Sequence, residues 1–565
     1  MTLIAFFGGI ETGLIYALVA LGVLISFRIL DFPDLTADGS FPLGAVVFAV
    51  SVGAGVNPWL ACLLGALAGA AAGTVTAWLH VSLNILPLLA SILVMVALYS
   101  LNLRITGGTP NLPLIDTPSV FSPFTAPDFS NQFWIQPLII LIFVIAAKLL
   151  LDWFFNTKTG LAVRATGINA RMARAQGVPT SKMIVLGMAL SNALIALGGA
   201  LFAQTSGSAD MSSGIGTHRH RPGRRHHWRK PAAGKTHLPH HPFRRPRLYR
   251  LSPDDCLRTR QRTTAKHRRA PHRPEPDYRR TGRIRPATAG RQTPSEKETD
   301  TMMRADNLKV TFNPGTAIEN PAMRGMSLHI RDGEFVTVIG SNGAGKSTFL
   351  NAVSGDLMVD SGSIHINGRD VTRLPAHKRA HLVARVFQDP LAGTCEALSI
   401  EENMALAYSR GRKRGLGFAL NRQNRELFRE KLALLKLGLE NRLTDRIGLL
   451  SGGQRQAVSL LMASLQPSKI LLLDEHTAAL DPKTAAFVME LTEQIVADNK
   501  LTAMMVTHSM RQALDHGSRT VMLHQGRVVL DVGGEKRAGM DVPDLLDLFE
   551  RTRGEQISDD SLLLD

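Results

Sequence analysis

Residues Gly340–Thr348 read GSNGAGKST, a glycine-rich run that ends in a lysine and two hydroxyl residues. The run fits the pattern GxxxxGK[ST], in which backbone N–H groups close around phosphates at the N-terminus of a helix. It follows a β-branched, apolar run at Phe335–Ile339 and precedes a helical pattern, which is the context that the motif requires. This stretch therefore predicts a nucleotide-binding α/β fold.

The lysine of this loop and the hydroxyl residue after it have distinct expected roles. Lys346 should reach the β- and γ-phosphates, and the Ser347 hydroxyl should ligate Mg²⁺. Because many nucleotide hydrolases carry the same pattern, the loop alone does not define the family. The loop residues that we expect to bind nucleotide are Gly340, Ser341, Asn342, Gly343, Ala344, Gly345, Lys346, Ser347 and Thr348.

A second motif supplies two carboxylates. Residues 470–475 read ILLLDE, which is the pattern of a buried strand that ends in acidic residues. Asp474 fits a residue that holds Mg²⁺ through water, and Glu475 fits the general base that polarises an attacking water. Together with the glycine-rich loop, these carboxylates predict hydrolysis of MgATP.

Three further motifs identify the class of ATPase. LSGGQ at 450–454 resembles the signature sequence of ATP-binding-cassette (ABC) proteins, whose backbone groups bind a γ-phosphate presented by a second cassette. Gln388 in VFQDP resembles the glutamine that touches the Mg²⁺ site and links it to the membrane domain. His508 in VTHSM resembles the histidine that contacts the γ-phosphate, and residues 479–481 resemble the D-loop. The signature residues that we expect to contact ATP are Ser451, Gly452, Gly453 and Gln454.

The order and spacing of the motifs are those of a complete cassette. Ser451 lies 105 residues after Lys346, and His508 lies 34 residues after Asp474. The resemblance implies an α/β P-loop NTPase with a helical subdomain over 302–565, with ATP and Mg²⁺ as cofactors. Since each ATP site needs the loop of one copy and the signature of another, it also implies a dimer. It assigns catalysis to Glu475, His508 and Gln388, and the metal to Ser347, Gln388 and Asp474.

Two further residues each have two interpretations. Phe312 is our candidate for stacking on the adenine, since ring stacking is favourable on any base, and the alternative is a core position in a strand. His476, in DEHTAALD, stands where most ABC proteins have proline. We interpret it as a turn residue rather than a catalytic one.

Residues 1–216 have the pattern of an all-α polytopic membrane domain. A helix needs about 20 mostly apolar residues to cross a bilayer. Candidate spans lie near 10–28, 41–56, 58–80, 86–103, 134–154 and 182–204. Several are rich in Gly and Ala, which suits close helix contact in lipid. The alternative, a soluble helical bundle, agrees poorly with six such runs that contain so few charges.

Loop charges predict the orientation of these spans. The loop at 104–132 has a single basic residue, whereas the loop after the fifth span holds several, so the first lies outside and the second in the cytoplasm. Residues 164–179 of the second loop read RATGINARMARAQGVP and resemble the segment by which importer permeases dock onto their ATPase. A solvated basic loop beside lipid headgroups is the alternative.

The membrane part resembles the permease of a bacterial ABC importer of the branched-chain amino-acid class, in its branch for aromatic amino acids. DLTADGSFPLG at 34–44 and the loop at 164–179 carry this resemblance, and the cassette agrees with it through 389–403 and DEHTAALD. The resemblance implies an inner-membrane protein in contact with lipid, with a cytoplasmic ATPase domain. It also implies permease subunits and an extracytoplasmic substrate-binding protein as partners.

Residues 218–291 account for the chain's net positive charge. This segment has 23 Lys or Arg against 4 Asp or Glu, within a chain of net charge +17. Rich in Arg, His and Pro, it cannot build a core, so we expect a basic disordered linker at 217–301. A nucleic-acid-binding tail and a metal site are the alternatives, but it lacks aromatic interleaving and ligand spacing, so we expect no nucleic-acid partner. The three cysteines are too scattered for a disulfide framework or zinc site.

The linker also raises a problem of topology. The sixth span should end outside, which would leave the ATPase without ATP, and such a permease should have more than six helices. We therefore interpret the permease as truncated at about 216 and the linker as a wrong-frame translation of its missing part. A fused exporter half-transporter and a non-transport ABC ATPase are the alternative functions. The short, Gly-rich spans disfavour the exporter. The presence of membrane spans disfavours the non-transport ATPase.

Overall fold

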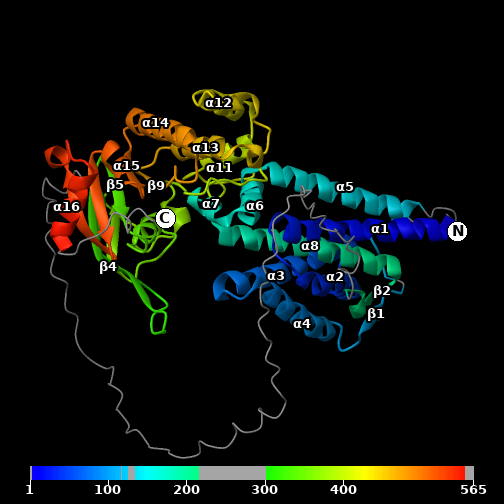
Figure 1. Ribbon diagram of the computed structural model, residues 1–565. Helices are drawn as coiled ribbons and strands as arrows, with labels where there is room; N and C mark the ends of the chain where they lie inside the picture. Colours follow the sequence, from blue (N-terminus) through cyan, green and yellow to red (C-terminus); the bar gives the residue numbers. More distant parts are fainter. Residues whose placement is uncertain (1–2, 116, 125–133, 215–300, 554–565) are drawn as a thin grey trace, which may run out of the picture. The chain divides into compact units, whose positions relative to one another are not determined.

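The protein, seen in a computed structural model, consists of long apolar helices within residues 3–206 and an α/β part within residues 301–553 (Figure 1). The structure describes residues 3–115, 117–124, 134–214 and 301–553. The predicted basic linker at 217–301 lies outside the described residues, apart from Thr301.

Six helices of the first part are long and apolar enough to cross a membrane, which confirms the prediction of a polytopic all-α domain. They are α1 (Leu3–Val23, continued by a π-helical turn at Leu24–Ile29), α2 (Thr36–Gly53), α3 (Pro58–Leu83), α4 (Pro87–Ile105), α5 (Ile135–Asn156) and α8 (Thr180–Ser206). The shorter elements are α6 (Lys158–Ile168), α7 (Ala170–Ala175), β1 (Asn111–Pro113), β2 (Ser208–Asp210) and a 3₁₀ turn at Met211–Gly214.

The second span begins at Thr36 rather than near residue 41, where hydropathy predicts it. Asp34 supplies the reason, because its Oδ1 accepts a hydrogen bond from the Thr36 N–H at 2.9 Å and so satisfies a donor at the helix N-terminus. The first turns of α2 are polar and yet buried, as Gly39 and Ser40 show. Hydropathy alone therefore misses the start of α2, whose first N–H group donates to a buried carboxylate.

Small residues let α2 and α3 lie directly on α8. A methyl group at Gly44, Gly69 or Gly73 would overlap a backbone carbonyl of α8, and one at Gly199 of α8 would overlap a carbonyl of α2. The Gly- and Ala-rich composition of these spans therefore permits close helix contact, as small residues do in membrane proteins.

Buried polar side chains cross the same contact. Asn192 of α8 donates from Nδ2 to Asp34 Oδ2 at 2.8 Å and accepts from Ser40 Oγ at 2.7 Å. The hydroxyls of Thr36 and Thr76 lie 2.8 Å apart and join α2 to α3. Polar groups inside a bilayer are costly without partners, and here they hold three spans in register.

The second part contains two sheets. The larger sheet has the order β12-β11-β5-β10-β9-β8, in which only β12 runs antiparallel to its neighbour. The smaller, antiparallel sheet has the order β4-β3-β6-β7. The strands are β3 (Thr301–Phe312), β4 (Asn320–Arg331), β5 (Phe335–Gly340), β6 (Ser361–Ile366), β7 (Arg369–Asp370), β8 (Val383–Val386), β9 (Ile470–Asp474), β10 (Thr502–Val506), β11 (Arg519–His524) and β12 (Arg527–Gly533).

Helices follow the parallel strands and also build the predicted helical subdomain between β8 and β9. The helices are α9 (Lys346–Ser354), α10 (Ala376–Arg379), α11 (Ile400–Tyr408), α12 (Arg422–Ala433), α13 (Gly452–Ser464), α14 (Pro482–Asp498), α15 (Met510–Asp515) and α16 (Val542–Arg553), with 3₁₀ turns at Leu439–Asn441, Ile447–Leu449 and Gly534–Lys536. The parallel strands β5, β8, β9 and β10 are buried along their whole length, as expected for a parallel sheet with both faces covered.

Candidate functional site

Four neighbouring strands bring the predicted catalytic motifs to one edge of the larger sheet. β9 ends at Asp474, which pairs in register with Val506, the last residue of β10. His508 follows β10, Gln388 follows β8, and β5 leads directly into the loop at 340–348. Because the carboxyl ends of parallel strands meet at one edge, residues far apart in the chain lie side by side there.

The glycines of the loop occupy backbone conformations that other residues rarely adopt. Gly340 has φ +151° and Gly345 has φ +99°. A methyl group at Gly340 would overlap the Leu523 carbonyl oxygen, and one at Gly345 would lie 2.9 Å from the Ala322 carbonyl oxygen. The loop can therefore fold close to its neighbours only with glycine at both positions.

Lys346 is buried within this loop. Its Nζ donates to the carbonyl oxygens of Gly340 at 2.7 Å and Ser341 at 3.3 Å. Burial lowers the pKa of Lys346, and the carboxylates of Glu475 and Asp474 oppose that effect. An anionic phosphate at the loop would offset the cost of burying the ammonium group. The side chain therefore fits the predicted phosphate contact.

The rest of the loop is more open. Asn342, Gly343 and Ser347 are exposed, Thr348 is half-buried, and Ala344 is buried at the base of the loop. The Ser347 hydroxyl belongs to the first turn of α9, where the backbone N–H groups have no helical partner. That position suits an anionic ligand.

Glu475 lies at the centre of the edge. Its Oε1 lies 2.7 Å from His508 Nε2, and its Oε2 accepts from Gln388 Nε2 at 3.0 Å. Its backbone has φ +45°, an uncommon conformation for a residue with a side chain and one that clusters at functional sites. The structure thus brings the three predicted catalytic side chains into direct contact.

Asp474 has a partner that the sequence analysis did not identify. Arg385 of β8 donates from Nη2 to Asp474 Oδ2 at 2.7 Å and from Nη1 to Asp356 Oδ2 at 3.0 Å. The same Nη1 lies 2.7 Å from Asn351 Oδ1 of α9. Arg385 is buried, so its charge requires these carboxylates. An arginine inside the apolar run VARVF is the sequence signal that could have revealed it.

The predicted Mg²⁺ ligands are oxygen atoms from different elements. Among the described residues, no group of three or more His, Cys, Asp or Glu side chains gathers as a metal site. Mg²⁺ does not need such a group, because it keeps several waters and takes one or two carboxylates together with substrate phosphates. The hydroxyl of Ser347, the amide of Gln388 and the carboxylate of Asp474 fit that chemistry.

The signature segment opens a 13-residue helix, α13. Ser451 Oγ accepts from the Gln454 N–H at 3.3 Å, and Gln454 Oε1 accepts from the Ser451 N–H at 3.2 Å, which forms a capping box. Gly452 is exposed, whereas a methyl group at Gly453 would overlap Thr484 of α14. An exposed, capped helix start of this kind favours a phosphate group.

Phe312 lies at the end of β3, on the smaller sheet. It pairs with Asn320 of β4, two residues before Ala322, whose carbonyl oxygen faces Gly345 of the nucleotide loop. The residue is 38% exposed, so it is not a core residue. This position is compatible with stacking on a bound base.

His476 is buried next to Glu475, at the edge of the larger sheet. Burial lowers the pKa of His476 to about 4, with a smaller contribution from His516. Its Nε2 lies 2.9 Å from the Thr492 hydroxyl of α14. A neutral, hydrogen-bonded side chain of this kind holds the turn after β9 onto α14, which agrees with a turn residue.

The loop at 164–179 contacts the cassette. It forms the end of α6 and all of α7, and residues of both helices share an apolar core with the helical subdomain. Arg164 Nη1 lies 2.6 Å from Glu402 Oε1 of α11, and Arg414 donates to the carbonyl oxygens of Gln176 and Gly177. These contacts favour the docking segment over the solvated loop.

Asn169 makes the most specific of these contacts. It caps α7 by accepting from the Met172 N–H at 2.9 Å. From Nδ2 it also donates to the carbonyl oxygens of Leu391, Ala392 and Thr394, at 3.1, 3.1 and 2.9 Å. The segment that Asn169 contacts therefore begins three residues after Gln388.

A second arginine links α7 to the sheet edge. The guanidinium groups of Arg171 and Arg385 both lie over the ring of Phe387, at 5.0 and 4.8 Å from its centroid. Arg171 Nη2 also lies 3.3 Å from Asn351 Oδ1, the oxygen that Arg385 contacts. The residues that sequence reasoning missed thus form one continuous path from α7 to Asp474.

The comparisons with known proteins agree with both halves of the chain. Residues 5–218 match the family described as the permease component of the branched-chain amino acid transport system, and residues 323–478 match the ABC transporter family. The cassette is 44% identical to the tyrosine transport ATP-binding protein of Clostridioides difficile over 44% of this chain and 99% of that protein. The membrane part is 42% identical to the tyrosine transport system permease protein of the same organism, over 36% of this chain and 66% of that protein.

A solved dimeric structure of a bacterial ABC transporter cassette covers 42% of this chain and 100% of its own, at 28% identity and a TM-score of 0.37.

Together, the fold, the edge of the sheet and these relatives define an ATP-hydrolysing membrane transporter. The chain belongs to the ABC transporter family and joins a permease of the amino-acid uptake class to an ATP-binding cassette. The predicted class, ATPase activity and nucleotide binding are thereby confirmed. Neither the exporter nor the non-transport alternative has support.

Proposed function

We propose that this chain uses the hydrolysis of MgATP to drive uptake of tyrosine, or a related aromatic amino acid, across a bacterial inner membrane. One observation carries the proposal. The two halves of the chain are each more than 40% identical to proteins of one organism, and both of those proteins are named for tyrosine transport. A cassette and a permease joined in one chain are expected to serve one substrate.

The residues at the sheet edge divide the work of hydrolysis. The N–H groups of the loop and Lys346 bind and orient the phosphates of ATP. Ser347, Gln388 and Asp474 would hold Mg²⁺, which supplies charge neutralisation at the β- and γ-phosphates. Glu475 accepts the proton of the attacking water, because its carboxylate is already positioned by His508 and Gln388.

The same residues connect hydrolysis to the partners. His508 can turn from Glu475 to the γ-phosphate, and the exposed start of α13 in a second cassette supplies the opposite side of the site. We therefore propose a dimer of cassettes on the cytoplasmic face. An extracytoplasmic binding protein would deliver the amino acid to the permease.

The test uses the full chain in nanodiscs and measures MgATP turnover together with binding of ATP and of labelled tyrosine. Glu475→Gln should lower turnover by about 10²- to 10⁴-fold, since it removes the base and keeps the shape. It should retain ATP and accumulate a nucleotide-bound dimer. Lys346→Ala should lose ATP binding, because the ammonium group that meets the phosphates is gone.

Glu430→Gln is the matched control, because it makes the same chemical change on the exposed surface of α12. Its turnover should equal that of the parent. Unchanged turnover in Glu475→Gln would remove Glu475 from the role of base. A parent chain that hydrolyses ATP but binds no tyrosine would contradict the substrate and leave the ATPase assignment standing.

A further inference from the structure

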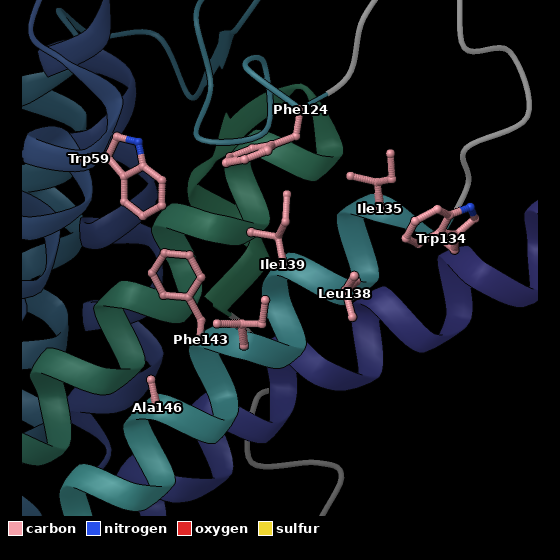
Figure 2. Close-up of a pocket in the computed structure, with 9 residues that line it drawn as sticks. Trp59, Phe124, Trp134, Ile135, Leu138, Ile139, Phe143 and Ala146 are labelled. Carbon is pink, nitrogen blue, oxygen red and sulfur yellow. The ribbon is translucent and has the colours of Figure 1, made fainter.

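Three described cavities lie in the membrane part, and they differ in chemistry. A cavity of about 550 Å³ lies along α5 between Trp59 and Trp134, and Figure 2 shows that rings and aliphatic side chains form its wall. A second, of about 530 Å³, continues along α5 past Phe143 and is lined by apolar residues. Neither contains a carboxylate or an amide, so both suit lipid chains.

The third cavity has polar groups and lies between α2 and α4. Its volume is about 450 Å³, which is within the range of pockets that hold small molecules. Its main lining residues are Asp38, Pro42, Met95, Tyr99, Asn102 and Met211.

Asn102 is the first observation that points to a ligand. Its side chain is buried, with 1% of the residue exposed. Its Nδ2 reaches the Gly39 carbonyl oxygen at 3.5 Å, but among the residues that the structure describes no donor pairs with its Oδ1. A buried amide oxygen without a donor is unfavourable, so an N–H or O–H group from a bound molecule would stabilise it.

Asp38 is the second observation. Its carboxylate lines the same cavity from the first turns of α2, half-buried in a membrane domain. An ionisable residue at such a place is costly and is a functional-site hypothesis by default. Asp38 and Asn102, whose side chains can both accept hydrogen bonds, therefore line one cavity.

The backbone around these groups is built for close approach. A methyl group at Gly39 would lie 3.0 Å from Leu98 Cδ1, so glycine lets α4 pack against α2 beside Asp38. Pro42 lies inside α2 and has no N–H to donate to the carbonyl four residues before it, that of Asp38. The rest of the lining is mostly apolar and includes Met95, Tyr99 and Met211. The Met211 N–H donates to the Pro110 carbonyl oxygen at 3.1 Å, which fixes that part of the lining.

We infer that this cavity is a substrate-binding site of the permease, which takes the ammonium group of an amino acid between Asp38 and Asn102. The apolar or aromatic side chain of the amino acid packs on Tyr99 and Met95. The inference rests on the proposed function and adds to it the residues that recognise the substrate. The loop charges place the end of α4, which holds Asn102, toward the outside and the start of α2, which holds Asp38, toward the cytoplasm, so the site lies between the two faces of the membrane.

The experiment measures binding of labelled L-tyrosine to the full chain in phosphatidylcholine nanodiscs, whose lipids carry no primary ammonium group. Asp38→Asn and Asn102→Leu should each weaken binding by about 10-fold or more, because the first removes the negative charge and the second removes the amide oxygen, while each keeps about the size of the side chain. Tyramine, which keeps the ammonium group and the ring, should compete. 3-(4-Hydroxyphenyl)propionate, which lacks the ammonium group, should not.

Ser100→Ala is the matched control, because Ser100 is an exposed residue of α4 that does not line the cavity. It should bind tyrosine like the parent. Elution as a single species and unchanged ATP binding show that each variant is folded. If Asn102→Leu does not fold, Asp38→Asn alone tests the site.

Each other outcome overturns the inference in a different way. Parent-like tyrosine binding in both variants would exclude this cavity and leave the amino-acid substrate intact. A parent that binds no tyrosine would remove the proposed substrate and the site with it. Displacement of tyrosine by phosphatidylethanolamine would assign the cavity to a lipid headgroup.

Discussion

At the scale of single residues, Arg385 shows how a buried arginine can position a carboxylate of the candidate site. The strand β8 is buried throughout, and a charged residue within it must have partners. Those partners are Asp474 and Asp356, and the first is a proposed Mg²⁺ ligand. Arg385 is therefore a positioning residue, because it acts through the carboxylate of Asp474.

We expect Arg385→Lys to keep the charge but lose the fork that holds both carboxylates. The full chain should still bind ATP, while the Mg²⁺ concentration for half-maximal turnover should rise by about 10-fold. Arg385→Met should unfold more readily, since Asp474 and Asp356 then lose the cation that bridges them. Titration of turnover with Mg²⁺ measures the effect. If Arg385→Lys only lowers the melting temperature and its Mg²⁺ dependence equals the parent's, the role is purely structural.

At the scale of elements, α7 joins the permease to the cassette through one capping residue. Asn169 satisfies the helix N-terminus with its oxygen and the carbonyls of 391–394 with its nitrogen. The two functions use different atoms of one amide, so a single substitution can separate them.

We expect Asn169→Asp to leave α7 folded and to weaken its contact with the cassette. Aspartate caps a helix as well as asparagine, but it has no N–H and repels the three carbonyl oxygens. Basal ATP turnover of the full chain should persist, while its dependence on tyrosine should fall several-fold. Asn421→Asp, at the exposed cap of α12, makes the same change away from the contact and should have no effect. Tyrosine-dependent turnover that survives Asn169→Asp would show that this contact does not carry the coupling.

At the scale of the whole molecule, the number of spans conflicts with the proposed location of the cassette. The loop charges place α6 and α7 in the cytoplasm, so α8 ends outside, and no described helix after α8 can cross a membrane. About a third of the permease relative also has no counterpart in its match, which covers 66% of that protein. Further spans are therefore expected to be encoded where the basic segment stands.

We predict that 217–301 is read in the wrong frame from two adjacent genes joined by a one-base slip near Thr217. His and Arg codons with suitable third bases, read one nucleotide later, encode Ile and Val, as apolar spans require. Residues 296–298 (Glu-Lys-Glu) need nine consecutive purines, where a ribosome-binding site for a gene starting at Met302 or Met303 would stand. Translation of the DNA in its other frames is the measurement. If neither frame contains an apolar run of about 20 residues between codons 217 and 300, the frameshift is refuted and the basic linker needs its own function.

The sequence by itself determined the chemistry of the cassette and the class of the permease. Each motif encodes its own local conformation, as the glycines around Lys346 and the strand before Asp474 do, so contiguous residues suffice to predict it. The number of spans follows in the same way, because the bilayer sets a length of apolar chain that no fold can avoid.

Only the tertiary structure brought Arg385 to Asp474 and Asn169 to the segment after Gln388. Each of these pairs joins elements that are distant in the chain, and each is defined by the direction and burial of polar side chains. Their physical cause is the cost of a buried charge or amide, which must find a partner in the packed fold. A local sequence pattern therefore does not predict which residue becomes the partner.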